Sequence, residues 1–251
     1  MKKLLVPTDF SPHAEAALDY AVEIANRFGS ALTLLHLYQV FSTSGTFLSV
    51  ENYMKKDFSR RLLRVLRKAE ARLQGGARLD SRIGRGETAP LIAETAEAGS
   101  YDLILMGTQG ASGLQEIFLG STTASVLRRT KTPVLAIPRA TAYQPLRRIV
   151  LALDEAGPAH AAVLHPLLQL AGRFGAHLYV YHKDQGKADG GIDLAVEQFV
   201  GDLEHSYHYE LDQDRLSQSI NDFVADVDAD LLCMIRRERG FLESIFRANA
   251  T

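Results

Sequence analysis

Glycines at fixed spacing follow an apolar run in the first half of the sequence. The run ends at Gly107, and glycines recur at Gly110 and Gly120, the last directly before Ser121 and Thr122. Glycine lets the backbone approach an anion closely, and a helix that opens at Gly120-Ser121 offers unpaired N–H groups and a favourable dipole. The spacing Gly107-x2-Gly110-x9-Gly120-Ser121 therefore predicts a phosphate-binding loop.

A second polar group follows the first apolar run of the chain. Pro7-Thr8-Asp9 ends that run, and Ser11 and Pro12 then suit the N-cap and the first position of a helix. In an open parallel sheet of order 3-2-1-4-5, ligands bind beyond the carboxyl ends of strands one and four, where the strand order reverses. We therefore expect Asp9 to face the glycine loop, with a base or ribose near Asp9 and phosphates near Gly120.

Strands and helices alternate along this half of the sequence. Short continuous apolar runs indicate strands covered on both faces, and apolar residues at helical spacing indicate the helices between them. We expect strands at residues 4–7, 31–37, 78–84, 103–107 and 133–138, and helices at residues 12–28, 50–73, 88–98 and 122–129. This alternation predicts right-handed crossovers and a doubly wound parallel sheet of the α/β class.

The second half of the sequence repeats the first. Residues 3–9 resemble residues 148–154, and residues 102–106 resemble residues 230–234. Residues 25–29 also recur as residues 171–175, and each copy is followed by an apolar run that ends in histidine, His36 or His182. We predict two tandem α/β domains, residues 1–140 and 146–251. The last helix and strand of the first domain have no counterpart before Thr251, so the second domain is expected to be truncated or degenerate.

The second copy also loses the glycine loop. The three loop glycines align with Ile235, Glu238 and Ala248, and a carboxylate at Glu238 would repel phosphate. We therefore expect no nucleotide in the second domain. Asp154 aligns with Asp9 and is interpreted as a turn or cap residue.

The glycine spacing, together with Val6-Pro7-Thr8-Asp9-Phe10-Ser11, resembles the nucleotide-binding branch of the universal stress protein family. The similarity covers residues 1–139 and, more weakly, residues 147–249. The resemblance implies two five-stranded sheets of order 3-2-1-4-5, like those of adenine nucleotide alpha hydrolases. It also implies a regulatory, stress-response module that binds ATP, or ADP or AMP, with Mg²⁺ as an optional companion.

The resemblance also implies the residues of the nucleotide site. They are Pro7, Thr8, Asp9, Leu37, Met106, Gly107, Gly110, Gly120, Ser121 and Thr122. In the family pattern, the position of Asp9 reaches the adenosine part and that of Leu37 lines the base pocket. The glycine loop and Ser121 hold the phosphates.

Composition excludes several other classes of protein. The 28 Lys and Arg against 30 Asp and Glu give a net charge of −2, and 46% of residues are hydrophobic, as in soluble globular proteins. A nucleic-acid binder that works by bulk charge is therefore not expected. No apolar stretch approaches the ~18 residues of a membrane span, and the opening run is broken at Pro7, so we expect a cytoplasmic protein that does not bind membranes. Cys233, the single cysteine, permits neither an internal disulfide nor a cysteine-based zinc site.

Motifs for catalysis are absent from the sequence. It contains no GxxxxGK[ST], GxSxG or HExxH motif, so we predict no catalytic or metal-binding residues. His205 and His208 are expected on opposite faces of a strand, which disfavours a metal site there.

Two alternatives to a regulatory module stay open: slow nucleotide hydrolysis, and a nucleotide-free protein that dimerises through the apolar edge strand at residues 133–137 or between the tandem domains. The basic helix from Lys55 to Arg72 is interpreted as a solvent-exposed face.

Overall fold

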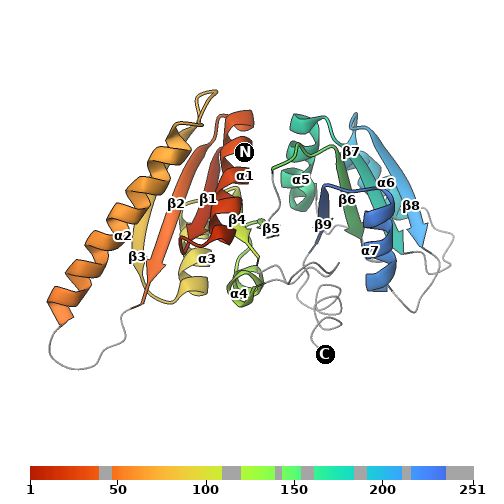
Figure 1. Cartoon of the computed structure of the whole chain (residues 1–251). Helices are drawn as coiled ribbons and strands as arrows, with labels where there is room; N and C mark the ends of the chain where they lie inside the picture. Colours follow the sequence, from red (N-terminus) through yellow and green to blue (C-terminus); the bar gives the residue numbers. More distant parts are fainter. Residues whose placement is uncertain are drawn as a thin grey trace. The chain divides into compact units, whose positions relative to one another are not determined.

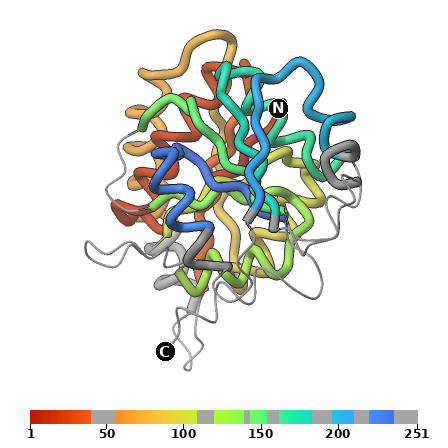
Figure 2. The backbone as a smooth tube through the Cα atoms, turned by 90° about the vertical axis from the view of Figure 1, so that its right-hand side faces the viewer, coloured from red at the N-terminus to blue at the C-terminus, as the bar shows by residue number. Residues whose placement is uncertain are grey.

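The computed structural model describes residues 1–39, 47–108, 120–138, 143–153, 161–183, 191–210 and 216–235, which Figure 1 draws in colour, and Figure 2 shows the backbone turned by 90°. The chain divides into two compact units, Met1–Tyr143 and Gln144–Thr251, here called the first and second units. Each contains a parallel sheet flanked by helices.

The first unit holds a five-stranded parallel sheet in the order β3-β2-β1-β4-β5, which confirms the predicted fold class. Its strands are β1 (Lys3–Thr8), β2 (Ala31–Tyr38), β3 (Arg78–Arg85), β4 (Leu103–Gly107) and β5 (Val134–Ile137). Its helices are α1 (Pro12–Phe28), α2 (Phe47–Glu70), α3 (Thr88–Ala98) and α4 (Ser121–Arg129). The order reverses beside β1, because β2 and β3 lie on one side of it and β4 and β5 on the other.

The three inner strands of the first sheet, β1, β2 and β4, are buried on both faces. Leu5, Leu35, Ile104 and Met106 pack with Ile92 of α3 in one apolar cluster, which also includes Val126 of α4. Neighbouring strand residues point to the opposite face, where His36 and Tyr38 contact Phe58 of α2. Figure 1 shows α2 running along β2 and β3.

The predicted signals at the ends of α1 are confirmed. The Ser11 side chain accepts a hydrogen bond from the Ala14 N–H at 3.3 Å, and Pro12 occupies the first turn. Gly29 ends the helix in the left-handed region at φ 65°, and its N–H bonds to the carbonyl of Ala25.

The second unit holds a four-stranded parallel sheet within the described residues, in the order β8-β7-β6-β9. Its strands are β6 (Arg148–Leu153), β7 (His177–Lys183), β8 (His205–Glu210) and β9 (Leu231–Met234). Its helices are α5 (Ala161–Phe174), α6 (Gly191–Val200) and α7 (Leu216–Asp226). By chain order this arrangement matches the 3-2-1-4 part of the first sheet. Residues 236–251, where the sequence predicts no final helix and strand, lie outside the described residues.

An aspartate anchors the first strand of each unit in the same way. Asp102 Oδ2 accepts hydrogen bonds from the backbone N–H groups of Lys2 and Lys3 at 2.5 and 2.8 Å. In the second unit, Asp230 Oδ2 accepts from the N–H groups of Arg147 and Arg148 at 2.8 and 2.9 Å. The sequence match between residues 102–106 and 230–234 therefore corresponds to the same contact in both units.

Candidate functional site

The carboxyl ends of β1 and β4 lie side by side at the point where the strand order reverses. Leu4 pairs with Leu103 and Leu5 with Ile104, in parallel register. The two strands end at Thr8 and Gly107, so the turns that follow them leave the same edge of the sheet. This edge is where ligands bind in open α/β sheets.

The turn between β1 and α1 holds Asp9 by short-range hydrogen bonds. Asp9 is exposed, and its Oδ1 accepts from the Ser11 N–H at 2.9 Å. The Phe10 N–H donates to Thr8 Oγ1 at 3.0 Å, and Phe10 has a φ of 64°. A non-glycine residue in this region is uncommon, and such residues cluster at functional sites. The turn thus fixes the Asp9 carboxylate at the sheet edge, with Oδ2 outside the Ser11 bond.

Three apolar residues of the predicted site share the face covered by α3. Met106 is buried in the cluster described above, and Leu37 is partly buried and packs against that cluster. Pro7 is buried, and strand alternation places it on the same face as Leu5. A β-carbon on Gly84, which pairs with Leu37 across β2 and β3, would lie 2.7 Å from Leu37 Cδ2. The structure therefore brings Pro7, Leu37 and Met106 to one apolar face near the carboxyl ends of their strands.

Gly107 lacks a side chain where helix α1 meets β4. A β-carbon there would lie 2.4 Å from the His13 carbonyl oxygen and 2.8 Å from His13 Cβ. The close approach that this glycine permits is thus an approach of the α1 backbone. From the sequence, Gly107 is interpreted as a position that lets the backbone approach an anion. The structure adds a second reason for a glycine here, the packing of α1 against β4.

Helix α4 begins beside the end of β4 with an open amino terminus. Gly120 is its N-cap and supplies no side-chain capping bond, while Ser121 and Thr122 are exposed. Thr123 is 2% exposed, and its Oγ1 donates to the Gly107 carbonyl at 3.0 Å. The Thr123 hydrogen bond therefore fixes the helix start to β4. The first N–H groups of the helix and the hydroxyls of Ser121 and Thr122 can donate hydrogen bonds to an anion. Gly110, the remaining predicted site residue, lies outside the described residues.

His36 is a residue beside this site that the sequence reasoning did not assign. Its Nδ1 is 2.8 Å from the Thr8 carbonyl oxygen, which only a protonated Nδ1 can bond as donor. Its ring lies 4.4 Å from that of Phe10 and 4.5 Å from that of Phe58, measured between centroids, and its Nε2 is buried without a hydrogen-bond partner. Burial lowers the pKa of His36, which the bond to Thr8 and the charge of Asp9 partly oppose. The ring packs beside the strand end that leads into Asp9.

Thr123 and His13 are two further residues beside the site that were not predicted from the sequence. Thr123 directly follows the predicted residues Ser121 and Thr122, and this position in the motif could have indicated it. His13 contributes through its backbone, so its residue type could not have indicated its role.

The second unit differs from the first at the corresponding strand ends. Ile235 stands where the first unit has Gly107, and its side chain is partly buried. Asp154, Glu238 and Ala248 lie outside the described residues. His182 pairs with Leu153 as His36 pairs with Thr8, and its Nε2 is also buried without a partner. As expected, His205 and His208 point to opposite faces, because His205 bonds Glu197 of α6 while His208 stacks on Phe223 of α7.

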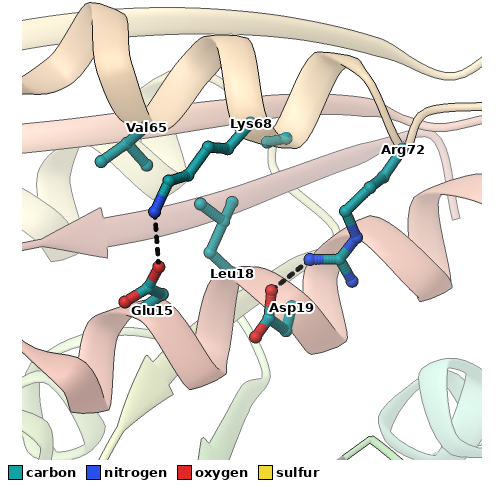
Figure 3. A pocket seen from close by; sticks show the side chains of 7 residues that line it. Glu15, Leu18, Asp19, Val65, Lys68 and Arg72 are labelled. Carbon is teal, nitrogen blue, oxygen red and sulfur yellow. Dashed lines mark hydrogen bonds and ion pairs between the residues drawn. The ribbon is translucent and has the colours of Figure 1, made fainter.

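A separate groove of about 320 Å³ lies between α1 and α2, away from the sheet edge described above (Figure 3). Leu18, Val65 and Ala69 supply its apolar lining. Lys68 reaches Glu15 at 3.6 Å, and Arg72 pairs with Asp19. Because these charges already neutralise one another, the groove offers no unsatisfied charge to a ligand.

The described residues of both units contain no group of three or more His, Cys, Asp or Glu side chains that could hold a metal ion. No helix among them is sufficiently long and apolar to span a membrane.

An open α/β sheet with a turn carboxylate and an uncapped helix start at its reversal point defines a class of ligand-binding α/β domains. The profile of the Universal stress protein family matches residues 1–138, and the chain belongs to that family. The universal stress protein MJ0577 of Methanocaldococcus jannaschii is 30% identical over 154 residues, which covers 55% of this chain and 95% of that protein.

Two solved structures extend the comparison. A universal stress protein from Archaeoglobus fulgidus matches 92% of this chain and 86% of its own, with a TM-score of 0.75 and 22% identity, a likeness of fold. A universal stress protein in complex with cAMP is 26% identical and covers 55% of this chain and 98% of its own, with a TM-score of 0.45.

Proposed function

We propose that the first domain, residues 1–140, binds ATP or another adenine nucleotide, and that the chain acts as a regulatory, stress-response binding module. The observation that carries the proposal is the uncapped start of α4, tied to Gly107 by Thr123 and placed beside the strand end that leads into Asp9. An anion at these N–H groups meets the positive end of a helix dipole.

The proposed arrangement is supported by the positions of the nine site residues that the structure describes, all except Gly110. The phosphates lie against Ser121, Thr122 and the glycine loop. The adenosine part lies near Asp9, whose carboxylate is exposed and held in its turn, and the base contacts the apolar face of Leu37. Mg²⁺, if bound, would sit on phosphate oxygens. The degenerate domain, residues 146–251, serves as a structural partner.

Substitution of Gly110 by Glu, the residue that aligns with it in the second half, tests this site. Thermal unfolding is measured with ATP, ADP, AMP and cAMP. A bound ligand raises the stability of the native chain, by about 2.7 kcal/mol at a hundred times its Kd. We expect this gain to be lost in Gly110→Glu and in Asp9→Ala. The control Ala71→Glu adds the same charge at an exposed position of the α2–β3 connection and should keep the gain.

Equal stabilisation of Gly110→Glu and the native chain would contradict the site assignment. Native mass spectrometry of freshly purified protein provides an independent measurement, because it reports retained nucleotide and subunit number together. Absence of any adenine nucleotide effect would contradict the function as well as the site.

The edge strand favours a second candidate, a nucleotide-free dimerisation protein. β5 lies at the edge of its sheet and pairs with β4 through Ala136 and Ile137 among others, which leaves its outer side for pairing with another chain. A chain that elutes as a dimer and shows no thermal shift with nucleotide would support this candidate. Lysine at Val134 should then convert the dimer to a monomer.

A further inference from the structure

The solvent face of α2 carries a stripe of cations that have no acidic partner among the described residues. Lys56, Arg60, Arg64 and Arg67 are exposed and follow one another at intervals of four, four and three residues, which places them on one helix face. Leu63 lies between Arg60 and Arg64 and is 53% exposed. We call these five residues the α2 stripe.

Three neighbouring cations are already paired. Lys68 of α2 and Arg72, just after its end, point toward α1 and reach Glu15 and Asp19 (Figure 3), and Arg61 bonds Asp57 at 2.9 Å. The α2 stripe is what remains after this pairing. Its like charges stand one turn apart on a helix, an arrangement that repels unless a partner supplies acids.

Helix α7 carries exposed carboxylates that have no basic partner among the described residues. Asp222 and Asp226 are exposed at the same four-residue spacing, with exposed Ala225 between them. The last turn of α7 contains no basic residue, and Asp226 ends the helix, where the dipole already disfavours negative charge. No cation among the described residues pairs with either carboxylate. We call these three residues the α7 face.

The two surfaces match in spacing and in charge. Arg60, Leu63 and Arg64 repeat the i, i+3, i+4 pattern of Asp222, Ala225 and Asp226, and each pair of charges is separated by about 6 Å along its helix. Helices that meet along these faces place two guanidinium groups against two carboxylates and seat Leu63 on the small Ala225. Each surface supplies the charge that the other lacks.

The two units differ in net charge in the same sense. The first unit has 18 Lys and Arg against 13 Asp and Glu, a net charge of +5, and the second has 10 against 17, a net charge of −7. A polyanion such as nucleic acid would be repelled by the second unit. A second copy of this chain instead brings an acidic unit to a basic one.

We propose that copies of this chain associate by docking the α2 stripe of one copy on the α7 face of another. The contact surface is small and charged, so the association is weak and depends on salt. It differs from edge pairing through β5 and does not depend on nucleotide.

Sedimentation velocity of the full chain tests the proposal at low and high salt, about 0.01 M and 1 M, where charges act over ~30 Å and ~3 Å. We expect association at low salt and monomer at high salt. The double variants Arg60→Glu/Arg64→Glu and Asp222→Lys/Asp226→Lys should each weaken low-salt association by about tenfold or more. An equimolar mixture of the two variants should restore it, because each then offers the charge that the other needs.

The matched control is Arg78→Glu/Arg82→Glu, which makes the same charge change at exposed positions of the edge strand β3 and should leave association unchanged. A native chain that stays monomeric at low salt would overturn the proposal. So would loss of association in the control, failure of the mixture to associate, or a dimer unaffected by salt and by both reversals. Circular dichroism of each variant confirms that it is folded.

Discussion

A β-carbon on Gly107 would lie 2.4 Å from the carbonyl oxygen of His13, closer than real side chains come to backbone. The first turn of α1 therefore rests directly on the end of β4, and this contact sets the distance between the turn that holds Asp9 and the strand that precedes the glycine loop. Both sides of the contact are backbone, so neither can move aside as a flexible side chain does.

Gly107→Ala should therefore destabilise the first unit. Because the obstructing atoms belong to the main chain, we expect a loss of about 1–3 kcal/mol in the free energy of unfolding, measured with urea. The control is Gly172→Ala in α5, where the new β-carbon would lie 3.4 Å from Leu203 Cδ2. That helical position should gain up to about 1 kcal/mol. Equal effects of the two substitutions would show that the His13 contact is not restrictive.

Thr123→Val tests whether the hydrogen bond from Thr123 anchors the start of α4 to β4. Valine keeps the shape but removes the hydroxyl that bonds the Gly107 carbonyl, so we expect a loss of about 1–2 kcal/mol in unfolding free energy and weaker nucleotide binding. Thr122→Val alters an exposed neighbour and should leave stability nearly unchanged. Calorimetry with and without nucleotide measures both quantities. Unchanged stability in Thr123→Val would contradict the anchoring role.

The stability of the first unit should fall in mild acid because of His36. Burial lowers the pKa of this ring below its ordinary value of 6.5, so below about pH 6.5 the unfolded chain binds a proton that the folded chain does not. The stability difference between the native chain and His36→Asn should therefore shrink as pH falls from about 7 toward 5. NMR titration of the His36 ring should give a pKa below 6.5, and a higher value would contradict this account.

His205 in the second unit should act with the opposite sign. The Leu203 carbonyl and then the Glu197 carboxylate accept hydrogen bonds from its ring and raise its pKa above 6.5. Its contribution to stability is complete below about pH 6.5 and is lost as pH rises through the raised folded value. Glu197→Gln should lower the pKa of His205, while Asp202→Asn, at an exposed site nearby, should not. An NMR titration that is identical in all three proteins would exclude the Glu197 contribution.

Local signals predicted most of the first unit. Ser11, Pro12 and Gly29 marked the limits of α1, and the strand at residues 103–107 was predicted with its observed bounds. The end of α2 was predicted at residue 73, because apolar spacing continues to Leu73. The helix instead ends at Glu70, where Asn26 bonds the Arg72 carbonyl and the Gln74 N–H and so stabilises the turn toward β3. A contact with a distant residue overrode the local pattern.

The candidate site was likewise predicted in part from local signals and decided in part by tertiary contacts. The sequence by itself determined the alternation of strands and helices, the repeat and the residue types that surround the proposed nucleotide, because glycine spacing, caps and apolar runs are local properties of the chain, whereas the expected strand order came from the family resemblance. Only the tertiary structure decided that Gly107 accommodates His13, that Thr123 fixes α4 to β4 and that His36 is buried between two phenylalanine rings. These contacts join residues far apart in the sequence, and their energies exist only after the sheet has brought its strand ends together.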